Sequence, residues 1–352
     1  MASRRFIGVP VKPISSDYDA ARMTQIIGSV VDKILSQPSP PTRSCSTATA
    51  HPIGVGTNKP EVAEYLPEVP PTQIAIPDLT GATQIGEGVY GVVYSVYDPS
   101  TNRTIVYKRI DKSKSKPELV QNEVRILNYL RDFCDPYFLC YIDYINDAEY
   151  FFIVTEFLGG YVGLETFSPK TPAETERVID NLIRGLTLIH QLGIAHRDIK
   201  PENCMVDPVS LNVKYIDFGL SCYGTGCQTN RPVGTPLFAA PELLHRRRDP
   251  FTLEDFQRAD LWALGMTIFE LVTGQNYFDA FLAKFILPEY TPKLRVPAYR
   301  SFSLRVLLNL LMSRPEPLPI APLLTSDCHL GLLETLLEKD PNRRSARPVS
   351  PR

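Results

Sequence analysis

The spacing of apolar residues changes part-way along the chain, and this change limits the folds that the sequence can adopt. From about Leu79 the chain runs through short β-type segments separated by turn residues, among them GVVYSVYD, TIVYKRI and YFFIVTEF. After Gly160 apolar residues recur three and four apart, as in ERVIDNLIRGLTLIHQLG and RADLWALGMTIFELVTG, and this spacing predicts helices. Strands first and helices later indicate an α+β body with two lobes.

The first 78 residues differ from the rest of the chain. Between Gln37 and Pro52, QPSPPTRSCSTATAHP has too few apolar residues to offset the entropy of ordering it, which predicts a linker. Before the linker, apolar residues recur at helical spacing: Met23, Ile26, Ile27, Val30, Val31 and Ile34. They predict an amphipathic helix over about residues 17–36. Because such a helix is marginal alone, it either docks on its own domain or frays, or it binds a partner; both alternatives stay open. We therefore expect an extension, 1–78, and one domain, 79–352.

Composition excludes several classes of function. The 37 Lys and Arg against 39 Asp and Glu give a formal charge of -2, so no broad attraction to nucleic acid or anionic membrane is expected. No apolar run approaches the roughly 18 residues of a membrane-spanning helix, and the start MASRRFIGVPV has no signal-peptide core. The seven cysteines lack the paired short spacings of a zinc site or a disulfide framework. These features favour a soluble protein of the cytosol or nucleus.

A glycine-rich segment is the first candidate for a binding site. Gly86, Gly88 and Gly91 in IGEGVYGVVY are spaced so that backbone N–H groups can approach phosphate oxygens. The same spacing occurs in dinucleotide-binding folds, where a helix follows it. Here the next residues, 92–97, are strongly β-forming, so a strand that covers a phosphate fits better.

Further along, a lysine and a glutamate form a second candidate. Lys108 ends the β-type run TIVYK, and Glu123 lies in the helical segment NEVRILNYL. Most such residues are simply solvated at the surface, but a lysine at the end of a buried-type strand is less ordinary. We expect Glu123 to hold Lys108 against the phosphates of ATP.

Three oxygen-bearing side chains form the third candidate. Asp198 and Asn203 lie in IAHRDIKPENCMVD, and Asp217 lies in KYIDFGLS. Any one of them could be an ordinary turn cap. All three, in this order and near two turns, predict a site that holds hard metal ions and an incoming hydroxyl group.

Together these motifs resemble the signature set of the eukaryotic protein kinases. HRDIKPEN, DFG at 217–219 and APE at 240–242 occur in the order that this family shows. The resemblance extends from about Leu79 to Arg344. It implies a small β-rich lobe, 79–157, a larger helical lobe, 158–352, and ATP in the cleft between them.

The resemblance also implies the nucleotide contacts. Lys108 would contact the α and β phosphates. The loop over the phosphates would contain Ile85, Gly86, Glu87, Gly88 and Gly91. The adenine would lie between Val93, Val106 and Met205. The gatekeeper and the hinge would be Thr155, Glu156, Phe157 and Leu158.

For the chemical step, the resemblance implies that Asn203 and Asp217 hold magnesium, that Asp198 accepts or aligns the proton of the acceptor hydroxyl, and that Lys200 stabilises charge on the transferring γ-phosphoryl group. Lys200 and the GTP at 234–236 resemble the serine/threonine branch, so a protein substrate is implied. Away from the chemistry, Arg344 would pair with Glu242.

Two alternatives remain beside a protein kinase. A pseudokinase scaffold would keep the fold without catalysis, but intact Lys108, Asp198, Asn203 and Asp217 oppose it. A phosphotransferase acting on a small molecule generally lacks the GT and APE elements that this chain has.

The segment from Asp217 to Glu242 is the expected site of control. In related kinases the arginine before the base, here Arg197, often pairs with a phosphorylated residue in this segment. The candidate acceptors are Ser221, Thr225 and Thr229, and we favour Thr229 because it lies nearest the peptide platform. We expect Cys222 and Cys227 to be ordinary loop thiols, a redox pair being the less favoured alternative.

Overall fold

The computed structural model describes residues 17–37, 65–72, 77–88, 91–99, 102–244, 248–286, 294–295 and 297–346. The chain divides into two compact units: a sheet unit, residues 58–229 and 251–257, and a helical unit, residues 1–57, 230–250 and 258–352. Apart from Gln37, the predicted linker lies outside the described residues.

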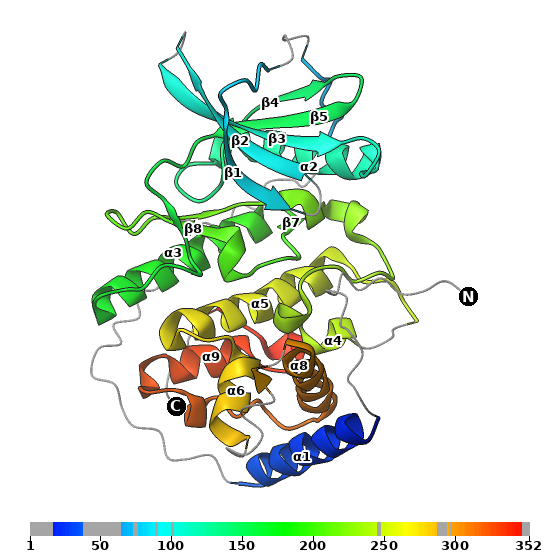
Figure 1. Cartoon of the computed structure of the whole chain (residues 1–352), viewed down its shortest axis with the longest axis vertical. Coiled ribbons are helices and arrows are strands. Elements are labelled where there is room, and N and C mark those ends of the chain that lie inside the picture. The colour runs from blue at the N-terminus through cyan, green and yellow to red at the C-terminus, as the bar shows by residue number, and fades with distance from the viewer. Residues whose placement is uncertain are drawn as a thin grey trace. The chain divides into compact units, whose positions relative to one another are not determined.

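The sheet unit contains a five-stranded antiparallel sheet in the order β1-β2-β3-β5-β4 (Figure 1). Its strands are β1 (Thr83–Gly88), β2 (Gly91–Asp98), β3 (Arg103–Asp111), β4 (Tyr141–Asn146) and β5 (Tyr150–Glu156). The run YFFIVTE forms β5, and its central residues are buried because β5 lies between β3 and β4. Lys108 does not end its strand as predicted, since pairing with β5 continues β3 to Asp111.

Helix α2 (Pro117–Leu130) lies beside the sheet and contacts β4 (Figure 1). It begins with a proline at its first position, where the missing N–H has no helical partner to lose. Its buried face consists of Val120, Glu123, Val124, Ile126, Leu127 and Leu130. One acidic residue, Glu123, therefore lies on the buried face of α2 among apolar side chains.

The rest of the sheet unit is built from one long helix and two small sheets. Thr171 caps α3 (Pro172–Gln191), because its hydroxyl accepts a hydrogen bond from the Glu174 N–H at 3.2 Å. The small sheets contain β7 (Ile194–Ala195) with β10 (Cys222–Tyr223), and β6 (Val162–Gly163) with β8 (Cys204–Val206) and β9 (Val213–Tyr215). The unit also contains short 3-10 helices: η1 (Arg131–Phe133), η2 (Pro201–Asn203), η3 (Phe218–Leu220) and η4 (Gly224–Cys227).

In the helical unit the described elements are α1 (Asp17–Leu35), α4 (Pro241–Leu244), the part of α5 (Leu253–Thr273) after Gln257, α6 (Tyr277–Phe285), α8 (Pro297–Ser313), α9 (Leu330–Leu336), η5 (Pro236–Phe238), η7 (Ala321–Leu323), η8 (Asp327–His329) and η9 (Pro341–Arg343). In this unit Arg344 pairs with Glu242 through both carboxylate oxygens, as the resemblance implied. None of the described helices is both long and apolar enough to span a bilayer.

Helix α1 packs on α8 within the helical unit (Figure 1). Met23, Ile27 and Val31, spaced four apart, are buried along one side of α1. At the surface, Asp32 pairs with Arg314 of the segment after α8. The predicted amphipathic stripe is therefore covered by the chain's own helix.

Disulfide bonds between described cysteines correct the expectation from the cysteine spacing. Cys134 is bonded to Cys140, and Cys222 to Cys227, with Cα separations of 5.0 and 5.1 Å. The partners lie only 6 and 5 positions apart in the chain, so a turn is enough to bring each pair into bonding range. The prediction that Cys222 and Cys227 are ordinary loop thiols is therefore wrong, whereas Cys204 is a buried free thiol.

The predicted α+β class is confirmed, since a sheet-rich region precedes a helical one. The boundaries predicted after residue 78 and after residue 157 stay predictions, and the compact units divide at other positions.

A pair of isoleucines tests how much the docking of α1 contributes to stability. Ile27 is fully buried, whereas the adjacent Ile26 is only half-buried. We expect Ile27→Ala to lower the free energy of unfolding by about 2–5 kcal/mol, because it removes a side chain from a packed interior. Urea unfolding followed by circular dichroism measures this effect. Ile26→Ala is the matched control and should cost clearly less; equal losses would show that α1 does not dock through this stripe.

Candidate active site

A lysine bonded to two carboxylates stands at the centre of the site. Lys108 extends from β3, and its Nζ lies 2.7 Å from Glu123 Oε1 of α2 and 3.1 Å from Asp217 Oδ1. The side chains of Lys108 and Glu123 are 20% and 7% exposed, and that of Asp217 is 44% exposed. The structure thus brings together three residues far apart in the sequence, and Asp217 keeps contact with solvent.

These charges shift one another's pKa values. Burial alone would lower the pKa of Lys108, but the charges of Glu123 and Asp217 and their hydrogen bonds raise it above its ordinary value. Burial raises the pKa of Glu123, and Lys108 offsets only part of that effect. Burial also acts to raise the pKa of Asp217, but Lys108 outweighs it and the pKa is lowered. Lys108 is therefore protonated and Asp217 ionised at neutral pH, as their predicted roles toward phosphate and metal require.

The backbone around Asp217 places its carboxylate beside Lys108. Asp217 has a φ of 59°, in the left-handed region. The next residue, Phe218, is fully buried, with its ring 5.0 Å from that of His196. A Cβ at Gly219 would lie 3.2 Å from Glu123 Oε2 and 3.3 Å from Asp217 Oδ1. A side chain there would fit tightly against both carboxylates, which would have to shift by a few tenths of an ångström.

A second polar cluster follows β7. Lys200 Nζ donates to Asp198 Oδ2 at 2.8 Å. The Asn203 amide nitrogen donates to the same oxygen at 3.1 Å and to the Asp198 carbonyl at 2.8 Å. The N–H of Ile216, just before Asp217, donates to the Asn203 carbonyl at 3.0 Å. Asp198, Lys200 and Asn203 therefore form one hydrogen-bonded group that is tied to the segment leading to Asp217.

The oxygen donors of Asn203 and Asp217 suit a hard cation such as magnesium. Because the Asn203 amide nitrogen faces Asp198, its oxygen is the atom left for a metal. Within the described residues no group of three or more His, Cys, Asp or Glu side chains could hold a metal by themselves. A magnesium ion here would need further oxygen ligands from phosphate and water, which is its usual preference.

The glycine loop is the turn between β1 and β2, where Gly86 pairs with Val93 and Gly88 with Gly91. A Cβ on Gly91 would come within 2.3 Å of the Arg109 carbonyl oxygen, so only glycine fits there. Ile85 and Glu87 are exposed on β1. The loop tip, residues 89–90, lies outside the described residues.

The predicted adenine contacts lie on several strands of the same unit. Val93 on β2 is opposite Lys108, and Val106 on β3 is opposite Thr155 of β5. Val106 and Thr155 are buried, and Met205 on β8 is half-buried. The predicted hinge begins at the end of β5 and consists of Glu156, half-buried, Phe157, exposed, and Leu158, half-buried.

Sequence reasoning missed a buried lysine at the hinge. Lys214 on β9 is 4% exposed, and its Nζ lies 2.7 Å from Glu156 Oε1. The same oxygen accepts the Cys140 N–H at 2.8 Å, so the carboxylate is held from two sides. The position of Lys214 between apolar residues in VKYI could have indicated that this lysine is buried. The sequence could not indicate that Glu156 is its partner, since Glu156 lies in a distant strand.

The predicted regulatory residues differ in exposure. Ser221 is fully buried and its hydroxyl donates to the His196 carbonyl at 3.1 Å, so phosphorylation would require this segment to open. Thr225 is exposed. Thr229 is half-buried, and its backbone pairs with Phe251 in both directions. The Arg197 Nε donates to the Leu220 carbonyl at 2.6 Å.

Comparison with known proteins gives a consistent result. A family model of the protein kinase domain matches residues 79–348. The Homo sapiens serine/threonine-protein kinase ULK3 is 27% identical over 269 residues, which cover 74% of this chain and 51% of that protein. The Arabidopsis thaliana CBL-interacting serine/threonine-protein kinase 18 is 30% identical over 243 residues, 66% of this chain and 45% of that protein. The chain therefore spans about half the length of these curated relatives.

Substitution of Lys108 tests the central ion pair. We expect Lys108→Met to weaken ATP binding or turnover by on the order of 10- to 100-fold, because a thioether cannot make charge-assisted bonds and Glu123 is left buried without its cation. Nucleotide titration and steady-state kinetics measure the effect. Lys114→Met is the control, since Lys114 is 77% exposed. Equal behaviour of the two variants would contradict a phosphate role for Lys108.

Proposed function

The chain belongs to the protein kinase family, and we propose that it transfers the γ-phosphoryl group of ATP to serine or threonine hydroxyls of protein substrates. The observation that carries this proposal is the contact of Lys108 with both Glu123 and Asp217, which joins a phosphate-binding cation to a metal-binding carboxylate. The relatives named above are described as serine/threonine-protein kinases, which supports the choice of acceptor.

We assign the steps of the reaction to the two polar clusters. Lys108 binds the α and β phosphates, and Glu123 keeps its ammonium group in place. The Asp198 carboxylate aligns the acceptor hydroxyl and takes its proton. Lys200, 2.8 Å from Asp198, balances charge on the group being transferred. Magnesium bound by Asn203 and Asp217 would neutralise charge on the phosphates.

The alternatives are weaker on physical grounds. In this chain Lys108 bonds to Glu123, and Asp198 accepts hydrogen bonds from Lys200 and Asn203. A pseudokinase scaffold, which does not catalyse, would not need these residues to be present together. A small-molecule phosphotransferase would not need the APE glutamate, Glu242, which is held by Arg344 in the helical unit.

The cellular compartment of the protein and its control by phosphorylation stay predictions. We keep the cytosol or nucleus as the expected compartment and expect no nucleic-acid or membrane partner. A phosphate on the segment after Asp217 would bring negative charge to Arg197, which already contacts the start of this segment.

An asparagine at the proposed base tests the chemistry. We expect Asp198→Asn to keep ATP affinity and to lower kcat by about 10²–10⁴-fold, since the amide accepts no proton from the substrate hydroxyl. Measurements are ATP titration and phosphorylation of a library of serine, threonine and tyrosine peptides. Turnover close to wild type would contradict the mechanism. Phosphorylation of a small alcohol but of no peptide would favour the small-molecule alternative.

Alanine substitutions test the regulatory threonines. Because Thr225 is exposed and Ser221 is buried, we expect mass spectrometry of active enzyme to find phosphate at Thr225 or Thr229 rather than at Ser221. Thr225→Ala combined with Thr229→Ala should lower kcat and leave ATP affinity unchanged. Full activity of this double variant would show that the segment is ordered without phosphate.

A further inference from the structure

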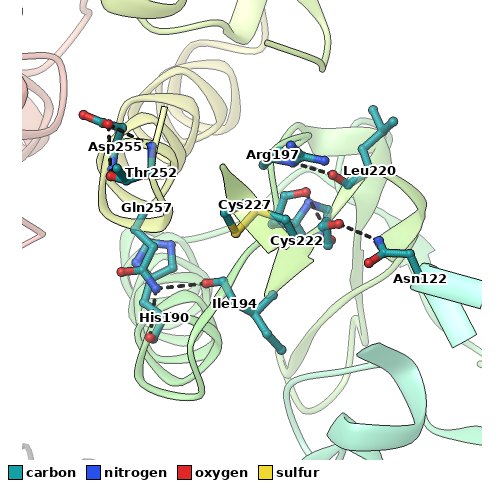
Figure 2. The surroundings of a disulfide bond; sticks show 12 residues. Asn122, His190, Ile194, Arg197, Leu220, Cys222, Cys227, Thr252, Asp255 and Gln257 are labelled. Carbon is teal, nitrogen blue, oxygen red and sulfur yellow. Dashed lines mark hydrogen bonds between the residues drawn. A yellow bond between two sulfur atoms is a disulfide. The ribbon is translucent and has the colours of Figure 1, made fainter. Parts of the chain in front are cut away.

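A disulfide closes a short turn next to the catalytic residues. Cys222 lies in β10, Cys227 ends η4, and the bond between them encloses Tyr223 to Gly226 (Figure 2). The phosphoryl-transfer chemistry proposed above makes no use of either sulfur. The disulfide nevertheless lies close to the proposed active site, because the strand that carries Cys222 contacts two elements of that site.

One of these elements is the catalytic loop. Strand β10 pairs with β7, so that Cys222 lies opposite Ala195 and Tyr223 opposite Ile194. Ala195 directly precedes His196, which is the first residue of the HRD motif. The Gln257 side chain donates to the Ile194 carbonyl at 3.1 Å and so holds β7 from another side (Figure 2).

The other element is α2, which carries Glu123. The Asn122 Nδ2 donates to the carbonyl of Ser221 at 2.9 Å, and Figure 2 shows the Asn122 side chain directed toward the chain beside Cys222. The Ser221 hydroxyl donates to the His196 carbonyl at 3.1 Å. Ser221, the residue before Cys222, therefore joins the helix of Glu123 to the catalytic loop.

We propose that Cys222 and Cys227 form a reversible thiol–disulfide site that controls phosphoryl transfer, and that the disulfide favours the assembled active site. This inference rests on the proposed kinase function. The bond removes conformations that the open turn would sample, so Ser221 is held where Asn122 and His196 can reach it. With two free thiols the turn samples more conformations, and Glu123 loses part of its support.

The chemistry is exchange with a small-molecule disulfide such as oxidised glutathione. The thiolate of one cysteine attacks the glutathione disulfide, forms a mixed disulfide and releases one glutathione thiolate. The second cysteine thiolate then attacks the protein sulfur of the mixed disulfide and releases the other glutathione. Two electrons pass from the cysteines to glutathione, and the two thiol protons end on the released glutathione. Excess reduced glutathione reverses both steps.

Access to the sulfurs requires only the turn to open. Cys222 and Cys227 are buried, but Thr225 and Gly226 between them are exposed. Among the described residues other than its chain neighbours, no atom lies within 4 Å of a Cβ built on Gly226, so this part of the structure leaves the turn uncovered there. Local opening of such a turn costs less than global unfolding. In a reducing compartment, disulfides are mostly transient and redox-sensing, which fits a reversible bond.

The proposal is tested by equilibrating the full chain in buffers that differ in the ratio of reduced to oxidised glutathione. The tryptic peptide that begins at Tyr215 contains Cys222 and Cys227 and no other cysteine, so alkylation and mass spectrometry report this bond alone. Phosphorylation of a serine or threonine peptide is measured on the same samples. We expect kcat to fall on the order of ten-fold as this disulfide is reduced, which is within the usual range for coupling in one protein.

Two double variants separate this bond from the bond between Cys134 and Cys140. Cys222→Ser with Cys227→Ser should show the activity of the reduced enzyme in every buffer. Cys134→Ser with Cys140→Ser should keep the response. Activity that does not follow the Tyr215 peptide, or a response that persists without Cys222 and Cys227, would overturn the proposal. Absence of activity in every buffer would instead contradict the proposed kinase function.

Asn122 provides a test that leaves both cysteines intact. Asn122→Leu should lower kcat of the oxidised enzyme toward that of reduced wild type and weaken its response to glutathione. The control is Asn128→Leu in the same helix, where Asn128 accepts a hydrogen bond from Arg131 instead. Thermal midpoints of both variants show whether folding is affected. An Asn122→Leu enzyme that is fully active and fully responsive would refute coupling through Ser221.

Discussion

A lysine held between two carboxylates is the interaction on which the site in the sheet unit depends. Lys108, Glu123 and Asp217 come from a strand, a helix and the segment after another strand. Each partly or fully buried charge is costly unless an opposite charge lies beside it. The cluster therefore forms only when β3, α2 and the Asp217 segment are all in place. Formation of the Lys108–Glu123 and Lys108–Asp217 ion pairs therefore requires that these three elements are correctly assembled.

Close backbone approach is the second constraint on the site. Gly91 lies against the Arg109 carbonyl, and Gly219 lies against the carboxylates of Glu123 and Asp217. At both positions a Cβ would come within 3.2 Å of an oxygen atom. Gly91 thus reflects the small volume that the neighbouring strand leaves free, whereas Gly219 marks a tight fit beside two charged side chains.

Supporting contacts then hold the groups proposed for catalysis through short chains of hydrogen bonds. Asn203 bonds to two oxygens of Asp198, and Ser221 links Asn122 to the catalytic loop. Lys214 holds the carboxylate of Glu156 at the end of β5. In each case a side chain fixes a backbone segment or a charged group that the proposed chemistry uses, and this is how a rigid scaffold positions reactive atoms.

The sequence by itself determined the α+β class, and it predicted the helix over about residues 17–36 and the candidate residues of the site, because strand and helix periods and fixed motif spacings are local properties. It did not reveal that Lys214 meets Glu156, that Asn122 reaches Ser221, or that Cys222 bonds to Cys227. Only the tertiary structure decided these contacts. Each depends on turns and packing that set the distance between two side chains, and residue type and spacing alone do not specify that distance.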